Sequence, residues 1–503
     1  MLFLGGEQVD TKQPTNMDIK LKNGMVYDPK KGTFNKRDLV IKNSIISNSD
    51  ASAKTYDIGG YYVYPGFVDS HLHLISTGKR QVTPSLDNIK SKQELSLLLR
   101  NYSANDQIAE IFNARGWDQD KLGFMPDRVY LDEFFPKTPA ILERRCGHVA
   151  VVNSIMIDRY NLKKFDGIDG TVISKGYLKE RALIKTQDLI TLSKEEISKF
   201  MNKGIDLLLG YGITHVHTDD FHGVELKTLL DTLSSQNRIK IFEKLNVPVT
   251  SIEEIKQYKE YENEFLTIGS VKIFLDGSFG ARTGALLDPY DDDTESKGLL
   301  YYSEEELKNI LTLCEKEKLQ LSIHIIGDRS LELALDVLSS YPKSSLKHRL
   351  IHLQVASNKQ ISRMTKIGLI ASIQPVFYIS DNEMAKARLG ENRYREKAYP
   401  FKKMFESGVS LSLSTDSPVE DPNPFLNIIA ADNFFDRKTI LYLYMINGRK
   451  HGFSNDTGRL LVGEKADFFI TKTDLLQASK IDLAETKAVV TFVNGNPVHG
   501  SLP

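Results

Sequence analysis

Two histidines separated by one residue stand at the end of an apolar stretch near the start of the chain. The stretch YYVYPGFVDSHLHL, residues 61–74, is typical of a strand and ends in His71-Leu72-His73. Side chains at positions i and i+2 of a strand point to the same side, so the two imidazoles should emerge together. Two neutral imidazoles held side by side form half of a divalent-metal site. An ordinary surface or core pair is the alternative, but further candidate ligands downstream favour the metal.

Four more polar residues interrupt later apolar stretches. They are Lys272 in VKIFLDGS, His324 in SIHIIGD, His352 in RLIHLQ and Asp416 in LSTDSP. A charge or an imidazole costs free energy in such a place unless something binds it. Each alone has an ordinary explanation, namely a satisfied core histidine, a strand-end cap, or a lysine whose charged end reaches water. The occurrence of all four residues at strand ends in one chain favours a shared site.

The elements that must position these residues alternate between strand and helix. After the first strand, apolar runs separated by helical segments lie at 211–218, 238–245, 269–276, 320–328, 348–354, 368–375 and 409–416. Together with the first strand these runs make eight, which is the strand number of an α/β (β/α)₈ TIM barrel. The active site of such a barrel lies at the carboxyl ends of its strands. A doubly wound open sheet is the rival architecture.

The remaining segments predict three further parts. Residues 17–65 and 455–503 hold short strands with tight turns such as KNG and VNGNP, and should pair into one small composite β-sandwich beside the barrel of 66–454. Residues 75–205 contain their own strands, at 109–117 and 139–148, and are interpreted as an insertion that caps the barrel mouth. Residues 1–16 are polar and irregular, and we expect a disordered leader.

Composition excludes several classes of protein. The 503 residues are 41% hydrophobic and 26% charged, with a net charge of −1, so no electrostatic argument favours nucleic acid or a membrane surface. No apolar window reaches the roughly 20 residues of a membrane span. Two cysteines, Cys146 and Cys314, make no disulfide framework and suggest a reducing compartment. The expectation is a cytoplasmic enzyme with a small-molecule substrate, and a homodimer would be unsurprising.

Together these motifs resemble the amidohydrolase superfamily and, more narrowly, its YtcJ-like branch, which includes N-substituted formamide deformylase. The matching stretches are PGFVDSHLHL, ARGWDQDKL, VKIFLDGSFGARTGAL, HIIGDRSLELALD, RLIHLQ, LSTDSPVEDPNPF and YMINGRKHGF followed by TGRLLVGEKADFFI. The likeness extends over nearly the whole chain from about residue 18. It is specific for the family and poorly specific for the substrate.

The resemblance implies a centre of one or two divalent metal ions. By this likeness His71, His73 and Asp416 would hold one ion, and His324 with His352 the second. Lys272 would bridge them as a carbamate formed with CO₂, because an ammonium beside divalent cations is strongly disfavoured. The alternative is an unmodified Lys272 that pairs with Asp416 in a one-metal or metal-free site. Zinc is the expected metal, although such ligands also accept manganese, iron or cobalt.

A mechanism follows from this ligand set. A bound divalent metal lowers the pKa of its water, and Asp416 would take the proton and pass it to the leaving nitrogen. The metal or an imidazole would stabilise the oxyanion. His217, in THVHTDD, is the candidate helper imidazole, preferred by the likeness over His215, and a hydrogen-bonded strand-end histidine is its equal alternative.

Residues that bind substrate are harder to assign. The likeness places Trp117 and Asp118 of RGWDQDKL towards the pocket, although a lone tryptophan is more often a core residue. Arg282, which follows Gly277 and Gly280 in a loop after the fourth strand, could bind a carboxylate or anchor the loop by an ion pair. His148 could line the entrance, and the acidic run at 288–294 suggests a solvated loop.

The sequence therefore predicts a metal-dependent hydrolase that cleaves a non-peptide C–N bond, in a linear or N-substituted amide. A deaminase of the same superfamily is the runner-up, against which Lys272 argues, because single-metal deaminases of that class typically do not rely on a lysine of the fourth strand. A non-catalytic scaffold with this fold is the third hypothesis. It is disfavoured because all six ligand positions are filled. The identity of the amide is not encoded in any readable motif.

Overall fold

The computed structural model describes residues 18–49, 53–86, 88–103, 111–144, 149–220, 224–454 and 456–503. They form two compact units. The first unit contains the described residues up to 77 together with 204–220 and 230–503, and the second contains those of 78–203 and 224–229. The leader expected at 1–16 lies outside the described residues.

A sheet of eight parallel strands is the centre of the first unit. Its order is β19-β18-β17-β16-β15-β14-β13-β8, so every strand pairs with its neighbour in the chain. The strands are β8 (Phe67–Leu72), β13 (Ile213–Thr218), β14 (Lys240–Leu245), β15 (Leu266–Phe274), β16 (Gln320–Ile325), β17 (Arg349–His352), β18 (Ile370–Ile373) and β19 (Ser410–Leu413). The end strands meet where the Ser70 hydroxyl donates to the Leu413 carbonyl, 2.9 Å away. The predicted (β/α)₈ barrel is confirmed.

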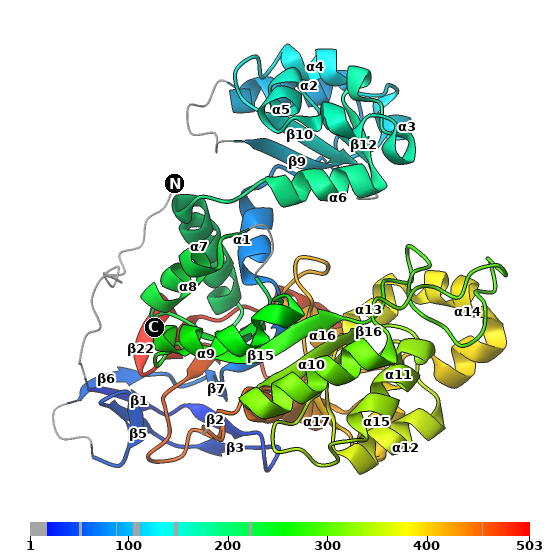
Figure 1. Cartoon of the computed structure of the whole chain (residues 1–503). Coiled ribbons are helices and arrows are strands. Elements are labelled where there is room, and N and C mark those ends of the chain that lie inside the picture. Colours follow the sequence, from blue (N-terminus) through cyan, green and yellow to red (C-terminus); the bar gives the residue numbers. More distant parts are fainter. Residues whose placement is uncertain are drawn as a thin grey trace. The chain divides into compact units, whose positions relative to one another are not determined.

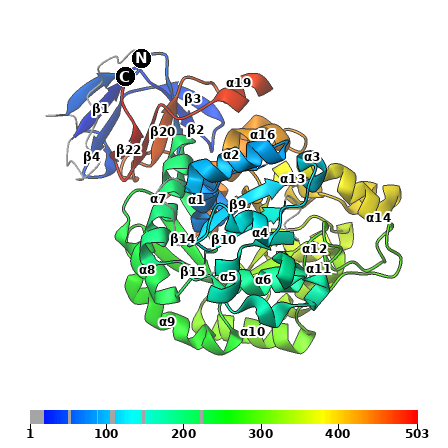
Figure 2. The same cartoon turned by 90° about the horizontal axis from the view of Figure 1, so that it is seen from above.

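Nearly every barrel-strand residue is buried, because side chains fill the interior and helices cover the outside. Figure 2 shows α9, α10, α11 and α12 following one another around the outer side of the strands. Capping boxes fix where two of these helices begin, with Ser303 and Glu306 at α10 and Ser357 and Gln360 at α12. The helices that carry residues of the first unit are α1 (Leu74–Val82), α7 (Lys194–Gly210), α8 (Leu226–Ser235), α9 (Ile255–Tyr258), α10 (Glu304–Glu317), α11 (Asp328–Leu338), α12 (Asn358–Ile367), α13 (Pro375–Ser380), α14 (Asn382–Lys397), α15 (Phe401–Glu406), α16 (Pro424–Ala431), α17 (Arg437–Tyr442), α18 (Gly448–His451) and α19 (Lys480–Glu485).

Strands from both ends of the chain build a sandwich of two sheets, ordered β5-β4-β1-β6 and β22-β21-β20-β7-β2-β3. Figure 1 shows the blue N-terminal strands and the red C-terminal strand β22 on the same side of the barrel. The two ends pair directly, with Phe469 opposite Tyr64. The strands are β1 (Ile19–Lys22), β2 (Met25–Asp28), β3 (Thr33–Lys36), β4 (Leu39–Lys42), β5 (Ile45–Ser47), β6 (Lys54–Asp57), β7 (Tyr62–Pro65), β20 (Phe468–Thr471), β21 (Val490–Val493) and β22 (Asn496–Gly500). The composite sandwich is thereby confirmed.

The second unit is a separate α/β body within the segment expected as an insertion. Its sheet has the order β12-β11-β10-β9, and β9 and β10 occupy the strands predicted at 109–117 and 139–148. One apolar core includes Trp117 and another includes Met156. Its elements are α2 (Lys92–Ser103), β9 (Phe112–Trp117), α3 (Gln119–Leu122), α4 (Arg128–Asp132), β10 (Ala140–Arg144), β11 (Val149–Val152), α5 (Ser154–Arg159), β12 (Tyr177–Lys179) and α6 (Glu180–Leu189). That the insertion caps the barrel mouth stays a prediction.

Over the described residues, none of the helices combines the length and the apolar character needed to cross a membrane.

The sandwich core offers a test of how the two chain ends stabilise each other. Phe468 and Phe492 are fully buried, and their rings stack at 4.5 Å between centroids. We expect Phe492→Ala to lower the free energy of unfolding by about 3–5 kcal/mol, because the ring leaves a cavity. Ile481→Ala, at a side chain that is 73% exposed, should change it by less than about 0.5 kcal/mol. Equal midpoints in urea denaturation for both variants would contradict this packing.

Candidate metal centre

The first strand of the barrel delivers the histidine pair to its carboxyl end. His71 lies in β8, and His73 is the first residue after that strand. The Nε2 atoms of His71 and His73 lie 3.2 and 3.4 Å from the same oxygen, Oδ1 of Asp416. The two imidazoles therefore face one point, in keeping with their spacing of two residues.

Asp416 reaches this point because the chain turns sharply after β19. Its backbone N–H donates to the His71 carbonyl at 2.9 Å, which ties the last strand to the first. The residue has φ +60°, a conformation that costs free energy for a residue other than glycine and is characteristic of functional sites. The turn is fixed further by the buried Asp69 carboxylate, which accepts from the Thr415 hydroxyl at 2.6 Å.

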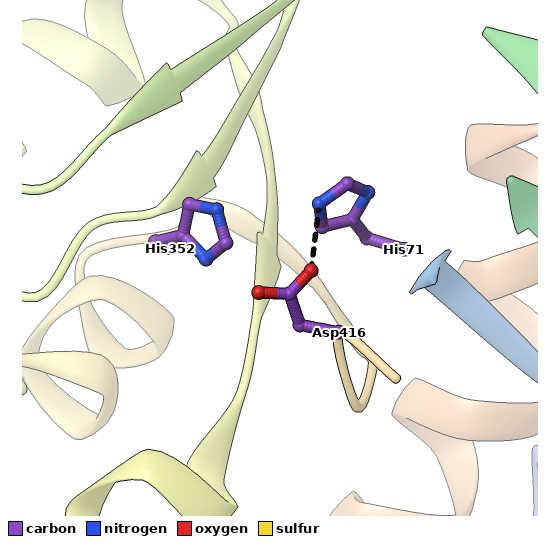
Figure 3. Close-up of side chains that lie close together, drawn as sticks. All are labelled: His71, His352 and Asp416. Atoms are coloured by element: carbon purple, nitrogen blue, oxygen red, sulfur yellow. Dashed lines mark ion pairs between the residues drawn. The ribbon is translucent and has the colours of Figure 1, made fainter. Parts of the chain in front are cut away.

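Two histidines from neighbouring strands complete the set. His324 of β16 and His352 of β17 have ring centroids 4.5 Å apart, and His352 lies 5.4 Å from His71 by the same measure. One ligand atom each from His71, His352 and Asp416 lie within 4.8 Å of one another. Figure 3 shows the Asp416 carboxylate between the two imidazole rings. Residues more than 300 positions apart in the sequence thus converge on one volume.

The second nitrogen of three of these rings is already engaged. Nδ1 of His73 bonds the Asp219 carbonyl at 2.6 Å, and Nε2 of His324 bonds the Gly277 carbonyl at 3.0 Å. Nδ1 of His352 bonds Oε1 of Gln374 at 2.9 Å. These oxygens only accept, so each ring donates through that nitrogen and keeps a lone pair on the other. This is the arrangement that metal-binding histidines use.

Burial favours the neutral form of these imidazoles. Burial, followed by the charges of Lys244 and Lys272, holds the pKa of His71 well below its usual value. Burial also lowers the pKa of His324 to about 3. At His73 burial acts in the same direction, but the hydrogen bond and charge of Asp416 outweigh it and raise the pKa. Neutral imidazole is the form that binds a metal, so the donor set fits a divalent cation.

Lys272 is connected to the centre through a different carboxylate from the one expected. Its ammonium is fully buried, 3.3 Å from Oδ2 of Asp219 and 3.6 Å from the centroid of the Phe274 ring. The alternative in which an unmodified Lys272 pairs with Asp416 is therefore wrong about the partner. Asp219 follows β13 directly, so the rule of polar residues at strand ends could have found it.

The surroundings of His217 match the alternative interpretation, a hydrogen-bonded histidine at a strand end. Its Nδ1 lies 2.8 Å from Nη1 of Arg349, and a Cβ on Gly452 would lie only 2.6 Å from its Nε2. Arg349 also donates to the Ser70 carbonyl at 3.0 Å, so the pair braces the barrel interior. Nδ1 is thus engaged by Arg349 and the Nε2 side of the ring packs against Gly452, so a catalytic role for His217 stays a prediction without support from these contacts.

The proposed substrate residues lie in several places. Trp117 is fully buried in the second unit, with its indole N–H on the Leu142 carbonyl at 2.9 Å, and Asp118 accepts from the Asp120 backbone as the cap of α3. His148 and Cys146 lie outside the described residues. Arg282 forms an ion pair with Asp292 at 3.1 Å, so it anchors its loop, as the alternative interpretation expected. The acidic run therefore includes a structural carboxylate and is not simply solvated.

A cavity of about 290 Å³ opens onto the centre. His71, His73, His324, His352 and Asp416 line part of it, and all of its described lining belongs to the first unit. Sequence reasoning missed Gln354 and Asp381 in this wall and Gln374 behind His352. Gln374 is a single polar residue at the end of an apolar strand, and Gln354 lies two residues after His352. Both positions could therefore have been predicted from the sequence. Asp381 lies between two helices and could not.

A second group of metal-type residues, His215, Asp456 and Asp467, has a different character. Lys240 pairs with Asp467 at 2.5 Å, and Arg449 pairs with Asp456 at 3.1 Å. Two cations already balance these carboxylates and would repel a metal ion. We therefore interpret this group as an ion-pair cluster.

Comparisons with known proteins agree with this geometry. A family model described as "Amidohydrolase family" matches residues 54–499. The chain is 27% identical to YtcJ of Bacillus subtilis (strain 168), over 74% of each chain. It is 21% identical to an N-substituted formamide deformylase of Arthrobacter pascens, over 88% of this chain and 89% of that one. A solved structure, an uncharacterized metal-dependent hydrolase from Pyrococcus furiosus, matches with a TM-score of 0.80 and 28% identity, over 92% of this chain and all of that one.

The two histidine clusters permit a matched test of where metal binds. Loss of a residue that only hydrogen-bonds a metal ligand lowers metal affinity by roughly 10- to 100-fold. We expect His71→Asn to lower zinc affinity by at least as much, because His71 is proposed to bind the ion directly. His215→Asn, at another buried strand histidine, should bind zinc like the parent protein. Metal per folded chain, measured by elemental analysis after dialysis at fixed free zinc, checks this. Loss of metal in His215→Asn alone would assign the ion to the other cluster.

Proposed function

The chain belongs to the amidohydrolase family, in its YtcJ-like branch, and on that premise we propose that it hydrolyses a non-peptide C–N bond in a linear or N-substituted amide. The family and the metal-facing residues make it a metal-dependent hydrolase. The observation that carries the proposal is Asp416, whose one oxygen faces both His71 and His73 where the cavity meets the barrel rim.

In the proposed site His71, His73 and Asp416 would hold one ion, and His324 with His352 would hold a second. A divalent metal, with zinc as the proposed ion, would supply Lewis-acid activation of water and of the substrate carbonyl. The chain holds the imidazoles in the required tautomers through the Asp219 and Gly277 carbonyls and through Gln374. Little reorganisation is then needed when substrate arrives, which is how preorganised sites lower a barrier.

Asp416 is the proposed general base and acid. Its carboxylate lines the cavity, so an attacking water can lose a proton to it, and the same proton can pass to the leaving nitrogen. The positive φ and the bond to the His71 carbonyl fix the backbone that carries this carboxylate at the rim. The products are then a carboxylic acid and an amine.

We propose that Lys272 is carbamylated in the active protein. The ammonium first gives up one proton to solvent. The resulting neutral amine joins CO₂ through a new N–C bond and loses a second proton, which Oδ2 of Asp219, 3.3 Å away, is placed to accept. The carbamate would supply two anionic oxygens in place of a buried ammonium, whose charge opposes that of divalent cations. Complete burial of Lys272 supports the proposal, because a carbamate needs protection from water.

Replacement of the proposed base tests the reaction. Asp416→Asn should lower kcat on N-formyl or N-acyl amides by about 100- to 10,000-fold, the range for general acid–base catalysis. Asp336→Asn, an exposed carboxylate on α11, should leave the rate unchanged. Initial rates over a panel of N-formyl, N-acyl and cyclic amides, with zinc and bicarbonate present, provide the measurement. Undiminished hydrolysis by Asp416→Asn would refute the assignment, and release of ammonia from amidines would favour a deaminase.

The modification of Lys272 has its own signature. After incubation with ¹³C-bicarbonate and zinc, we expect a protein-bound carbamate resonance in the ¹³C NMR spectrum that is lost in Lys272→Met. Lys244→Met, at the other fully buried lysine of the barrel strands, should retain the resonance. A signal that persists in Lys272→Met would show that the carbamate, if formed, is elsewhere.

A further inference from the structure

Most of the cavity wall beyond the metal-facing residues is apolar. The side chains that make it so are Phe274, Phe279, Ile326, Phe377, Met384 and Val419. Such a wall takes a hydrophobic substrate body, and about 290 Å³ is close to the lower end of the roughly 300–1,000 Å³ typical of ligand pockets. The substrate should therefore be compact.

Besides Ser278, two neighbouring polar side chains, Gln354 and Asp381, interrupt this wall. Gln354 is 97% buried, and its amide nitrogen lies 3.5 Å from Oδ2 of Asp381 as a long hydrogen bond. Asp381 precedes α14 at the position where an aspartate usually caps the first turn, yet its side chain makes no capping bond. The carboxylate lines the cavity instead, and with the Gln354 amide as its donor it is left as an acceptor towards the substrate.

No cation in the described wall balances this carboxylate. The described residues that line the cavity include neither lysine nor arginine. Arg282, in the loop after β15, and Arg388 of α14 both pair with Asp292. Burial raises the pKa of Asp381 against the hydrogen bond from Gln354, and burial together with the charge of Asp381 raises the pKa of Glu420. The described wall therefore offers the Asp381 carboxylate no side chain of opposite charge.

We propose that Asp381, assisted by Gln354, selects amide substrates that carry a positively charged amine at the end of a compact apolar body. This inference rests on the proposed amidohydrolase function and names its substrate class. A substrate ammonium would supply the missing counter-charge in a partly buried setting, where a hydrogen bond to a charged group is worth about 10- to 100-fold in affinity. A substrate carboxylate, as in N-acyl amino acids, would be repelled.

Three matched formamides test the selection. They share a benzyl body and carry at the para position an aminomethyl group, a hydrogen or a carboxylate. We expect kcat/KM to fall in that order, and Asp381→Asn to reduce the ratio of the aminomethyl to the unsubstituted substrate by about 10- to 100-fold. Asp381→Lys should reverse the order. Glu383→Gln, an exposed carboxylate two residues away on α14, should keep the parent ratios.

A binding measurement separates this inference from the hydrolytic proposal. Titration calorimetry of benzylammonium and of benzyl alcohol into the zinc-loaded protein requires no turnover. We expect Asp381→Asn to weaken benzylammonium about tenfold and to leave benzyl alcohol unchanged. This result without any amide hydrolysis would support the subsite and overturn the proposed reaction. Hydrolysis with no charge preference, or equal binding of the cation by Asp381→Asn, would overturn the subsite and leave the reaction standing.

Discussion

The hydrogen bond from the Asp416 backbone to the His71 carbonyl joins the last strand of the barrel to the first, and the centre depends on it. Each ligand alone is an imidazole or a carboxylate whose burial costs free energy. Parallel pairing brings their strand ends to one rim, and this bond brings the most distant of them together. His71 and His73 then lie 3.2 and 3.4 Å from one oxygen of Asp416, where a bound cation would offset the cost of burial.

Beneath the rim, charged groups that do not line the cavity support this arrangement. Asp69 is fully buried, and its pKa is raised to about 7 by burial, against the hydrogen bonds from Thr415 and His71. Arg349 bridges the Ser70 and His451 carbonyls and the His217 ring. Such a network leaves each member few alternative positions, so it holds the rim in one geometry. Its residues therefore have a positioning role and lie outside the reacting volume.

The cavity divides the work between its two parts. The metal-facing residues can serve any member of a broad class of hydrolases, because water activation does not depend on the rest of the substrate. The apolar wall, with the Asp381 carboxylate and the Gln354 amide, would determine which amide enters. With this division, a change confined to the wall would alter the substrate and leave the centre intact.

Much of this could be read from the chain before any coordinates. The apolar runs fix eight strands in order, the two-residue spacing of His71 and His73 fixes their common face, and polar residues at strand ends identify His324, His352 and Asp416. These are local patterns, in which period and position within a strand determine direction. Barrel closure then follows from the strand count and the right-handed crossovers of parallel pairs.

What only the tertiary structure decided is the choice among partners. Lys272 could have paired with Asp416 and instead meets Asp219, while Arg282 is bound by a carboxylate of a run that appeared to be solvated. His217 lies against Arg349, and Asp381 leaves its helix uncapped to face the cavity. A sequence shows which charges exist, but which of several equal charges comes within reach depends on loop paths and packing between distant segments. That distance is set by the whole fold, and so are the pocket and its selectivity.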